Sequence, residues 1–341
     1  MGEKKRYIWL DIIKILSCFL VIVNHSHSYL FQVADTNLAT VTFDAFFFSI
    51  CKIAVPLFVM TTGYLTLQKE VSYKKTFLRI VRIFVPLVIV STAFYWLYNG
   101  YKINILDLFK KSIANPTHIS LWYLYMLIGM YLVIPFIQKL ISNASVRDLS
   151  LFVLFFFVIP TAIRFIASFL QLNISSFIFS SFFPESVCYL VAGVLLSRIP
   201  LKRSSLIVSI ILYLASLIPV ILSIILTYKS EGQIKYAFDS WTSLPVIVSS
   251  MSFFYIIRYI FENVKADNTL SKIIQSISAT TFGVYIIHIF AINKLFYLPL
   301  MQKILQANAF LGILVLQILI FSICSALIFI IRKIPFVKNF L

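Results

Sequence analysis

The sequence predicts an all-α integral membrane protein, a polytopic bundle of about ten transmembrane helices. Of its 341 residues, 61% are hydrophobic and only 12% are charged, about half the charged fraction of a soluble domain. The apolar runs are continuous and about twenty residues long, which is the length that crosses a bilayer as a helix. They do not alternate polar and apolar residues as the strands of a membrane β-barrel do.

Ten segments qualify as spans, and short connections join them. Their approximate ranges are 8–31, 43–67, 78–98, 119–141, 149–170, 182–198, 205–228, 241–262, 273–295 and 309–332. The longest connection, 99–118, is too short for a soluble domain, and no internal repeat is visible. The sequence therefore predicts one integral-membrane domain over residues 1–341.

The first of these runs is long for a signal peptide. It covers residues 8–31, contains Asp11 and Lys14, and shows no small-x-small cleavage site. We therefore expect it to be retained as the first span.

Positive charge predicts the orientation of the bundle. With the N-terminus inside, the cytoplasmic segments hold 19 Lys and Arg residues, the outer segments hold 7, and three lie within spans. Cytoplasmic loops are enriched in these residues, so we expect both termini in the cytoplasm. The same enrichment accounts for the net charge of +17, and we expect no nucleic-acid partner.

The cysteines and histidines predict no metal site. The four cysteines lie in apolar runs without CxxC spacing, as expected of buried thiols that act as small hydrophobes. His25 and His27 are two residues apart, and side chains at that spacing on a helix do not converge on one ion.

Ionisable residues inside spans are costly, so they mark candidate functional positions. Lys14 and His25 are eleven residues apart on the first span, which places them on one helix face, about 16 Å apart along the axis. His27 points nearly the opposite way if the helix stays regular. The alternatives are a local ion pair between Lys14 and Asp11 and a purely structural His25.

A second group of ionisable side chains gathers at the predicted outer side. Asp44, His118 and His288 lie at the outer ends of their spans, and Arg164 and Glu185 reach the same depth across a short connection. Interface preference is one explanation for this group. A structural ion pair is the alternative for Arg164 and Glu185.

A basic segment marks the predicted cytoplasmic start of the third span. Lys74, Lys75, Arg79 and Arg82 lie there, and the last two share one helix face. Two guanidinium groups beside a helix N-terminus suit a phosphate-rich ligand. Ordinary enrichment of positive charge on the inside is the alternative.

Five stretches, in the family's order, resemble the type 3 membrane acyltransferases, bacterial integral-membrane O-acyltransferases of surface glycans. Residues 10–25 are similar to the family's opening span, and 55–65 to its Pro-Leu-Phe…Ser-Gly-Phe segment, with Thr62 in place of the Ser. Residues 77–83, 121–124 and 281–288 resemble its Arg-x-x-Arg, Leu-Trp-(Phe/Tyr)-Leu and Gly-x-Tyr-x-x-His segments.

The resemblance implies acyl transfer from a cytoplasmic acyl-CoA, with acetyl expected, to an envelope glycan or its lipid-linked precursor at the bacterial cytoplasmic membrane. The family's basic residue, usually Arg, maps to Lys14, and its histidine maps to His25, as general base or acyl carrier. The pair associated with acyl-CoA maps to Arg79 and Arg82. Donor acyl-CoA is expected as a substrate, without a tightly bound cofactor.

Four outer residues are candidates to support the acceptor substrate: Arg164, Glu185, Trp122 and His288. The alternative function is a transporter or flippase for a lipid-linked or small polar substrate. Transporters often show inverted repeats and Gly/Pro-broken helices, whereas this chain has eight glycines and no visible repeat. A non-catalytic membrane sensor is a third hypothesis, in which the shared face of Lys14 and His25 has no obvious use.

Overall fold

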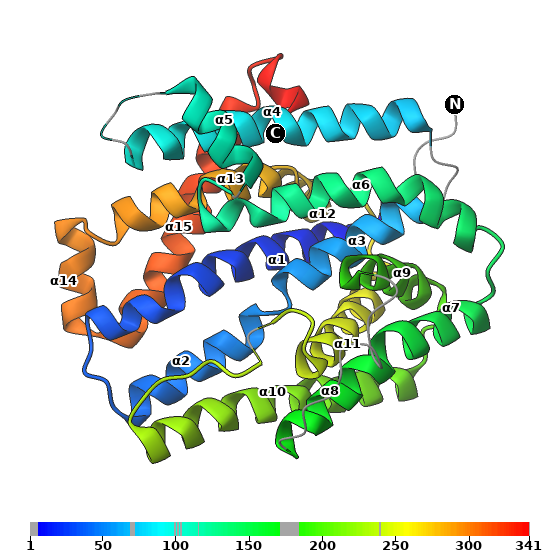
Figure 1. Ribbon diagram of the computed structural model, residues 1–341, viewed down its shortest axis with the longest axis horizontal. Coiled ribbons are helices and arrows are strands. Elements are labelled where there is room, and N and C mark those ends of the chain that lie inside the picture. Colours follow the sequence, from blue (N-terminus) through cyan, green and yellow to red (C-terminus); the bar gives the residue numbers. More distant parts are fainter. Residues whose placement is uncertain are drawn as a thin grey trace.

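The computed structural model describes residues 6–68, 72–98, 100, 102, 104–114, 116–170, 184–238 and 240–340. Every regular element in these ranges is helical, which confirms the predicted all-α bundle. Figure 1 shows most of the long helices running in roughly the same direction, with α14 lying across one end of the bundle.

Fifteen α-helices are described. They are α1 (Ile8–Ser26), α2 (Leu38–Cys51), α3 (Ala54–Leu67), α4 (Tyr73–Tyr98), α5 (Ile105–Ala114), α6 (Trp122–Ile141), α7 (Val146–Val153), α8 (Ile159–Phe169), α9 (Glu185–Arg198), α10 (Arg203–Glu231), α11 (Leu244–Phe261), α12 (Thr269–Ser278), α13 (Thr281–Leu295), α14 (Pro299–Ala307) and α15 (Ala309–Ile331). The short 3₁₀ segments are η1 (His27–Gln32), η2 (Ile119–Leu121) and η4 (Val337–Asn339), and the π-helical turn η3 (Leu154–Val158) joins α7 to α8.

The number of spans is slightly lower than predicted. Eight helical runs among the described residues are long and apolar enough to cross a membrane, or nine if α12 and α13 form one span bent by 56°. The predicted span 182–198 corresponds to α9, which has 14 residues and is shorter than the roughly 20 residues that a bilayer requires. α9 is enclosed by protein on nearly all sides, so its apolar sequence reflects burial.

Local sequence signals explain several helix boundaries. Asn37 and Thr40 form a capping box at the start of α2, and Ser145 and Asp148 form one at α7. α10 ends at Gly232, whose φ of 68° favours glycine. The predicted span 43–67 is two helices, because α2 stops before the proline in the first turn of α3, which disfavours a continuous helix.

Two glycines allow α3 and α9 to cross with their backbones in contact. A Cβ on Gly63 would lie 2.1 Å from the Leu190 carbonyl oxygen, and one on Gly193 would lie 2.1 Å from the Met60 carbonyl oxygen. Small residues at such crossings let membrane helices approach closely. The crossing fixes α3, which forms one wall of the site described below.

The first and last spans meet at the bend between α12 and α13. Arg6 donates to the Asp11 carboxylate and to the Gln275 carbonyl, and Arg332 donates to the Ala279 carbonyl. Arg6 and Arg332 therefore lie at the same end of the bundle, which agrees with the prediction that both termini lie on one side. That this end faces the cytoplasm remains the prediction from charge.

Candidate active site

A pocket of about 350 Å³ surrounds Lys14 near the α12–α13 bend. Its wall combines Lys14 of α1; Phe58, Thr61, Thr62 and Leu65 of α3; Tyr123, Leu127 and Tyr131 of α6; Ser278, Ala279, Thr281, Phe282 and Tyr285 along the bend and α13; and Arg332. Within the Pro-Leu-Phe segment, the Thr62 hydroxyl donates to the Phe58 carbonyl oxygen. The buried Thr61 hydroxyl has no hydrogen-bond partner among the described residues.

The ion pair between Lys14 and Asp11 is a loose one. Lys14 Nζ lies 4.0 Å from Asp11 Oδ1. The buried Asp11 carboxylate is already bound by Arg6, at 2.8 and 3.1 Å, and by the Ser278 hydroxyl, at 2.6 Å. Asp11 therefore anchors α1 to α12, while the half-buried Lys14 side chain borders the pocket.

Arg79 and Arg82 line a second pocket, of about 310 Å³, between α4, α6, α13 and the C-terminal segment. Leu127, Tyr131 and Phe282 line both pockets, so the two cavities are direct neighbours. The Arg79 guanidinium carbon lies 5.8 Å from the centre of the Tyr131 ring. Cationic side chains thus line two neighbouring pockets between α4 and Lys14.

The N-terminus of α4 contributes less than the sequence suggested. α4 begins at Tyr73, so Arg79 lies about 9 Å further along the helix axis. The influence of a helix dipole falls off within the first turn. The two arginine side chains, and not the helix terminus, therefore carry the anion-binding capacity here.

His25 and His288 form an adjacent pair at the other end of α1. Their ring centres are 5.2 Å apart. His288 is fully buried, and its Nδ1–H donates to the Tyr285 carbonyl oxygen at 2.5 Å. That bond leaves Nε2 as the acceptor nitrogen, and it has no hydrogen-bond partner among the described residues.

Tyr285 connects the histidine pair to the Lys14 pocket. Its ring lines the pocket and lies 5.6 Å from the ring of His288. Its hydroxyl donates to the Ser120 carbonyl oxygen. Lys14 therefore lines the pocket, whereas His25 does not, and Tyr285 of α13 lies between the pocket and the histidine pair.

His118 lies near the histidine pair. Its ring stacks on Phe94 at 4.4 Å, and its Nδ1 accepts the Ser120 N–H. Burial lowers the pKa of His118, which favours the neutral ring.

His27 belongs to a different network. The α-helix ends at Ser26, so the assumption of a regular helix fails at His27. His27 Nδ1 lies 2.5 Å from one oxygen of Asp44, and the Tyr236 hydroxyl donates to the other oxygen at 2.8 Å. Burial and the Asp44 carboxylate raise the pKa of Tyr236, so its hydroxyl stays protonated as a donor.

The other predicted outer residues do not border these pockets. Arg164 Nη2 and Glu185 Oε1 are 3.9 Å apart, and both side chains are partly exposed, which agrees with a structural ion pair. Trp122 lies 5.9 Å from Trp241 between ring centres. Their roles in acceptor binding remain predictions.

The structure also brings together cations that sequence motifs did not single out. Arg332 lines the Lys14 pocket and Lys338 lines the Arg79 pocket. Both were indistinguishable from ordinary inside charge, since their neighbours lie far away in the sequence. Lys52 could have been singled out from the sequence, because it is a cation within the predicted span 43–67.

Lys52 lies at the break between α2 and α3. Its Nζ is 4.1 Å from the centre of the Phe48 ring. The preceding Cys51 thiol donates to the Asn24 side chain at 3.4 Å. Lys52 is close enough to act electrostatically on His25. Within the described ranges, no three His, Cys, Asp or Glu side chains converge as a metal site.

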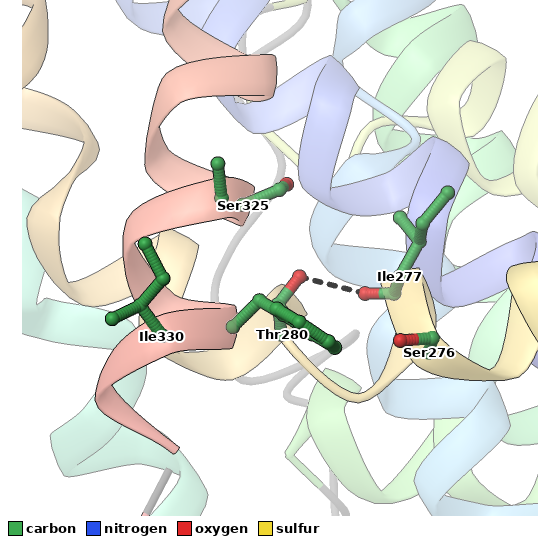
Figure 2. Close-up of a pocket in the computed structure, with 7 residues that line it drawn as sticks. Ser276, Ile277, Thr280, Ser325 and Ile330 are labelled. Carbon is green, nitrogen blue, oxygen red and sulfur yellow. Dashed lines mark hydrogen bonds between the residues drawn. The ribbon is translucent and has the colours of Figure 1, made fainter. Parts of the chain in front are cut away.

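A third pocket, of about 300 Å³, lies between the α12–α13 bend and α15. Figure 2 shows Ser276, Ile277 and Thr280 facing Ser325 and Ile330 of α15, with the Thr280 hydroxyl bonded to the Ile277 carbonyl oxygen at 2.8 Å. Its lining contains no charged or titratable side chain. It therefore offers no acid–base chemistry.

Comparison with known proteins favours an enzyme over a transporter. A family model described as an acyltransferase domain matches residues 7–331. No match was found among curated proteins or among solved structures. The matched range contains Lys14, His25, Arg79, Arg82 and His288, and it ends just before Arg332.

Proposed function

Because the chain belongs to the type 3 membrane acyltransferase family, we propose that it transfers an acetyl group from cytoplasmic acetyl-CoA to a hydroxyl of an envelope glycan or its lipid-linked precursor. One observation carries this proposal. The two cation-lined pockets lead from Arg79 and Arg82 to Tyr285, behind which His25 and His288 lie. The bacterial cytoplasmic membrane is the proposed location.

The donor end of this path suits acyl-CoA. Arg79 and Arg82 bind its phosphates, since guanidinium groups form strong, directional hydrogen bonds to phosphate oxygens. The side chains of Leu127, Tyr131 and Phe282, which line both pockets, surround the less polar pantetheine arm of the donor. The thioester then lies in the Lys14 pocket, closest to Tyr285.

The opposite end of the path, where His25 and His288 lie and which we call the histidine end, suits proton transfer. In direct transfer, the acceptor hydroxyl oxygen attacks the thioester carbonyl carbon while His25 takes the hydroxyl proton. The carbon–sulfur bond breaks, and the departing CoA thiolate takes the proton from His25. In the alternative route, a ring nitrogen of His25 attacks the thioester carbon, the carbon–sulfur bond breaks, and the CoA thiolate leaves with the ring proton. The acceptor hydroxyl oxygen then attacks the acyl carbon, the carbon–nitrogen bond breaks, and the hydroxyl proton returns to His25.

His288 is suited to orient and stabilise His25. Its Nδ1–H is held by the Tyr285 carbonyl oxygen, so its Nε2 lone pair is available when His25 acquires a proton. A hydrogen bond between the two rings would then hold the positively charged form of His25. Fixing the tautomer of a histidine through its other nitrogen is a common way to orient it.

Acetyl transfer can be tested in cells and with purified protein. Envelope glycans from bacteria expressing the protein should carry base-labile acetyl groups by mass spectrometry, and glycans from cells expressing His25→Ala should lack them. Purified protein should transfer label from acetyl-CoA to an isolated envelope glycan fraction. Equal acetylation with and without the folded protein would contradict the proposal.

A further inference from the structure

The C-terminal segment folds over the Arg79 pocket, which together with the Lys14 pocket forms the two proposed donor pockets. After α15, the chain turns, and Lys338, Asn339 and Phe340 form part of the wall that faces Arg79 and Arg82. The Lys338 N–H donates to the Ile334 carbonyl oxygen at 3.1 Å, and the rings of Phe336 and Phe340 are 5.3 Å apart. This segment lies beyond the residues that match the family.

The segment adds a third cation to a pocket that has no described acidic side chain in its wall. Arg79, Arg82 and Lys338 take part in none of the ion pairs found among the described residues. Like charges around one cavity repel each other unless an anion neutralises them. Three cations therefore indicate a ligand with more than one phosphate charge.

The order of groups along the donor assigns each cation a partner. The proposed function places the thioester beside Lys14, so the nucleotide at the other end of CoA lies in the Arg79 pocket. Arg79 and Arg82 share one face of α4, and their planar guanidinium groups suit the diphosphate. Lys338 on the facing wall is a compact point charge, and the remaining anion of CoA is the 3′-phosphate of its ribose.

We propose that Lys338 binds the 3′-phosphate of CoA, so that the C-terminal segment selects CoA thioesters over donors that lack this phosphate. The inference rests on the proposed function, because it assumes that acyl-CoA occupies the two pockets. Phe340, in the same wall, offers an aromatic face to the adenine ring. Acyl groups carried on phosphopantetheine alone would lose both contacts.

Binding of two ligands to three proteins tests this inference. CoA and 3′-dephospho-CoA are titrated by calorimetry into purified wild type, Lys338→Gln and Lys333→Gln at one salt concentration. Lys338 is exposed, so its replacement should leave the fold intact. Lys333 is a matched control, since it is also exposed, lies 5.5 Å from the Phe329 ring centre and lines neither donor pocket.

We expect Lys338→Gln to bind CoA about tenfold more weakly than wild type, which is the scale of one hydrogen bond to a charged group. Its affinity for 3′-dephospho-CoA should be unchanged, as should both affinities of Lys333→Gln. Equal weakening for both ligands, or no weakening for either, would overturn the assignment. A wild type that binds neither ligand would instead contradict the proposed function and, with it, the premise of this inference.

Discussion

At the donor end of the site, cations face open pockets, whereas at the histidine end aromatic rings pack closely together. Arg82 and Lys338 are exposed, while His288 is fully buried. A charged donor has to enter and leave, which requires access and unpaired positive charge. Reacting groups have to be held in a fixed geometry, which requires packing and preset hydrogen bonds. The comparison predicts that donor binding and chemistry can be damaged separately.

The largest effect is expected from His25→Ala. Loss of a general base removes a factor of about 100 to 10,000 in rate, while donor affinity should stay nearly unchanged because the phosphate contacts lie at the other end. Turnover and donor binding are measured on folded, purified protein at matched concentration. Normal turnover by this variant would refute the role of the histidine end.

His27→Ala is the matched control, since His27 faces Asp44 and Tyr236 instead of His288. It should keep substantial activity. A folded but inactive His27→Ala variant would transfer the proposed chemistry to the histidine that is paired with a carboxylate.

The stability of the α3–α9 crossing, which supports the site, should be sensitive to substitution of Gly63. A methyl group there meets the Leu190 backbone at 2.1 Å, so Gly63→Ala should destabilise the protein by about 1–3 kcal/mol through overpacking. Gly129 has nothing within 4 Å of an added Cβ, and Gly129→Ala should melt like wild type. Thermal unfolding in detergent compares the two, and equal melting temperatures would argue against the close crossing of α3 and α9.

Replacing Arg79 and Arg82 together with Gln should damage binding alone. Each charge-assisted contact is worth about 1.5–3 kcal/mol, so the donor Kd should rise by at least tenfold. Turnover at saturating donor should stay close to that of wild type. Arg147→Gln removes an exposed arginine that lines neither donor pocket and serves as the control. An unaltered Kd would instead favour the alternative that Arg79 and Arg82 only reflect the enrichment of positive charge on the cytoplasmic side.

The smallest effect is expected at Arg164. Its pairing with Glu185 spans 3.9 Å with both side chains partly exposed, and such pairs contribute about 1 kcal/mol or less. Arg164→Gln should therefore leave turnover unchanged and lower the melting temperature by only a few degrees. A large loss of turnover in this variant would instead indicate that Arg164 takes part in binding the acceptor.

Local patterns predicted most of the fold because spans and helix faces are local properties. Apolar runs located the spans, and helical periodicity placed Lys14 and His25 on one face. The same patterns could not separate α9 from a spanning helix, since burial in protein and burial in lipid favour the same residues. They also could not show that η1 begins at His27, where the helical geometry changes.

Contacts between distant segments were the main part of the site that the sequence did not show. His288 was identified, but nothing local paired it with His25. Lys338 was counted only as inside charge, because its proximity to Arg79 depends on how the last turn folds back over α4 and α6. Long-range packing, which no short motif encodes, brings these residues together.

The contacts of α1 with α12 and α13, which are made much later, have a consequence for biosynthesis. His25 is made 263 residues before its partner His288, a delay of roughly 13–53 s at 5–20 residues per second. During that interval Asp11 lies in the first span without the Ser278 hydroxyl. Arg6, only five residues away, can pair with the Asp11 carboxylate as soon as this span inserts. The local ion pair thus neutralises a costly charge until the rest of the bundle arrives to complete the site.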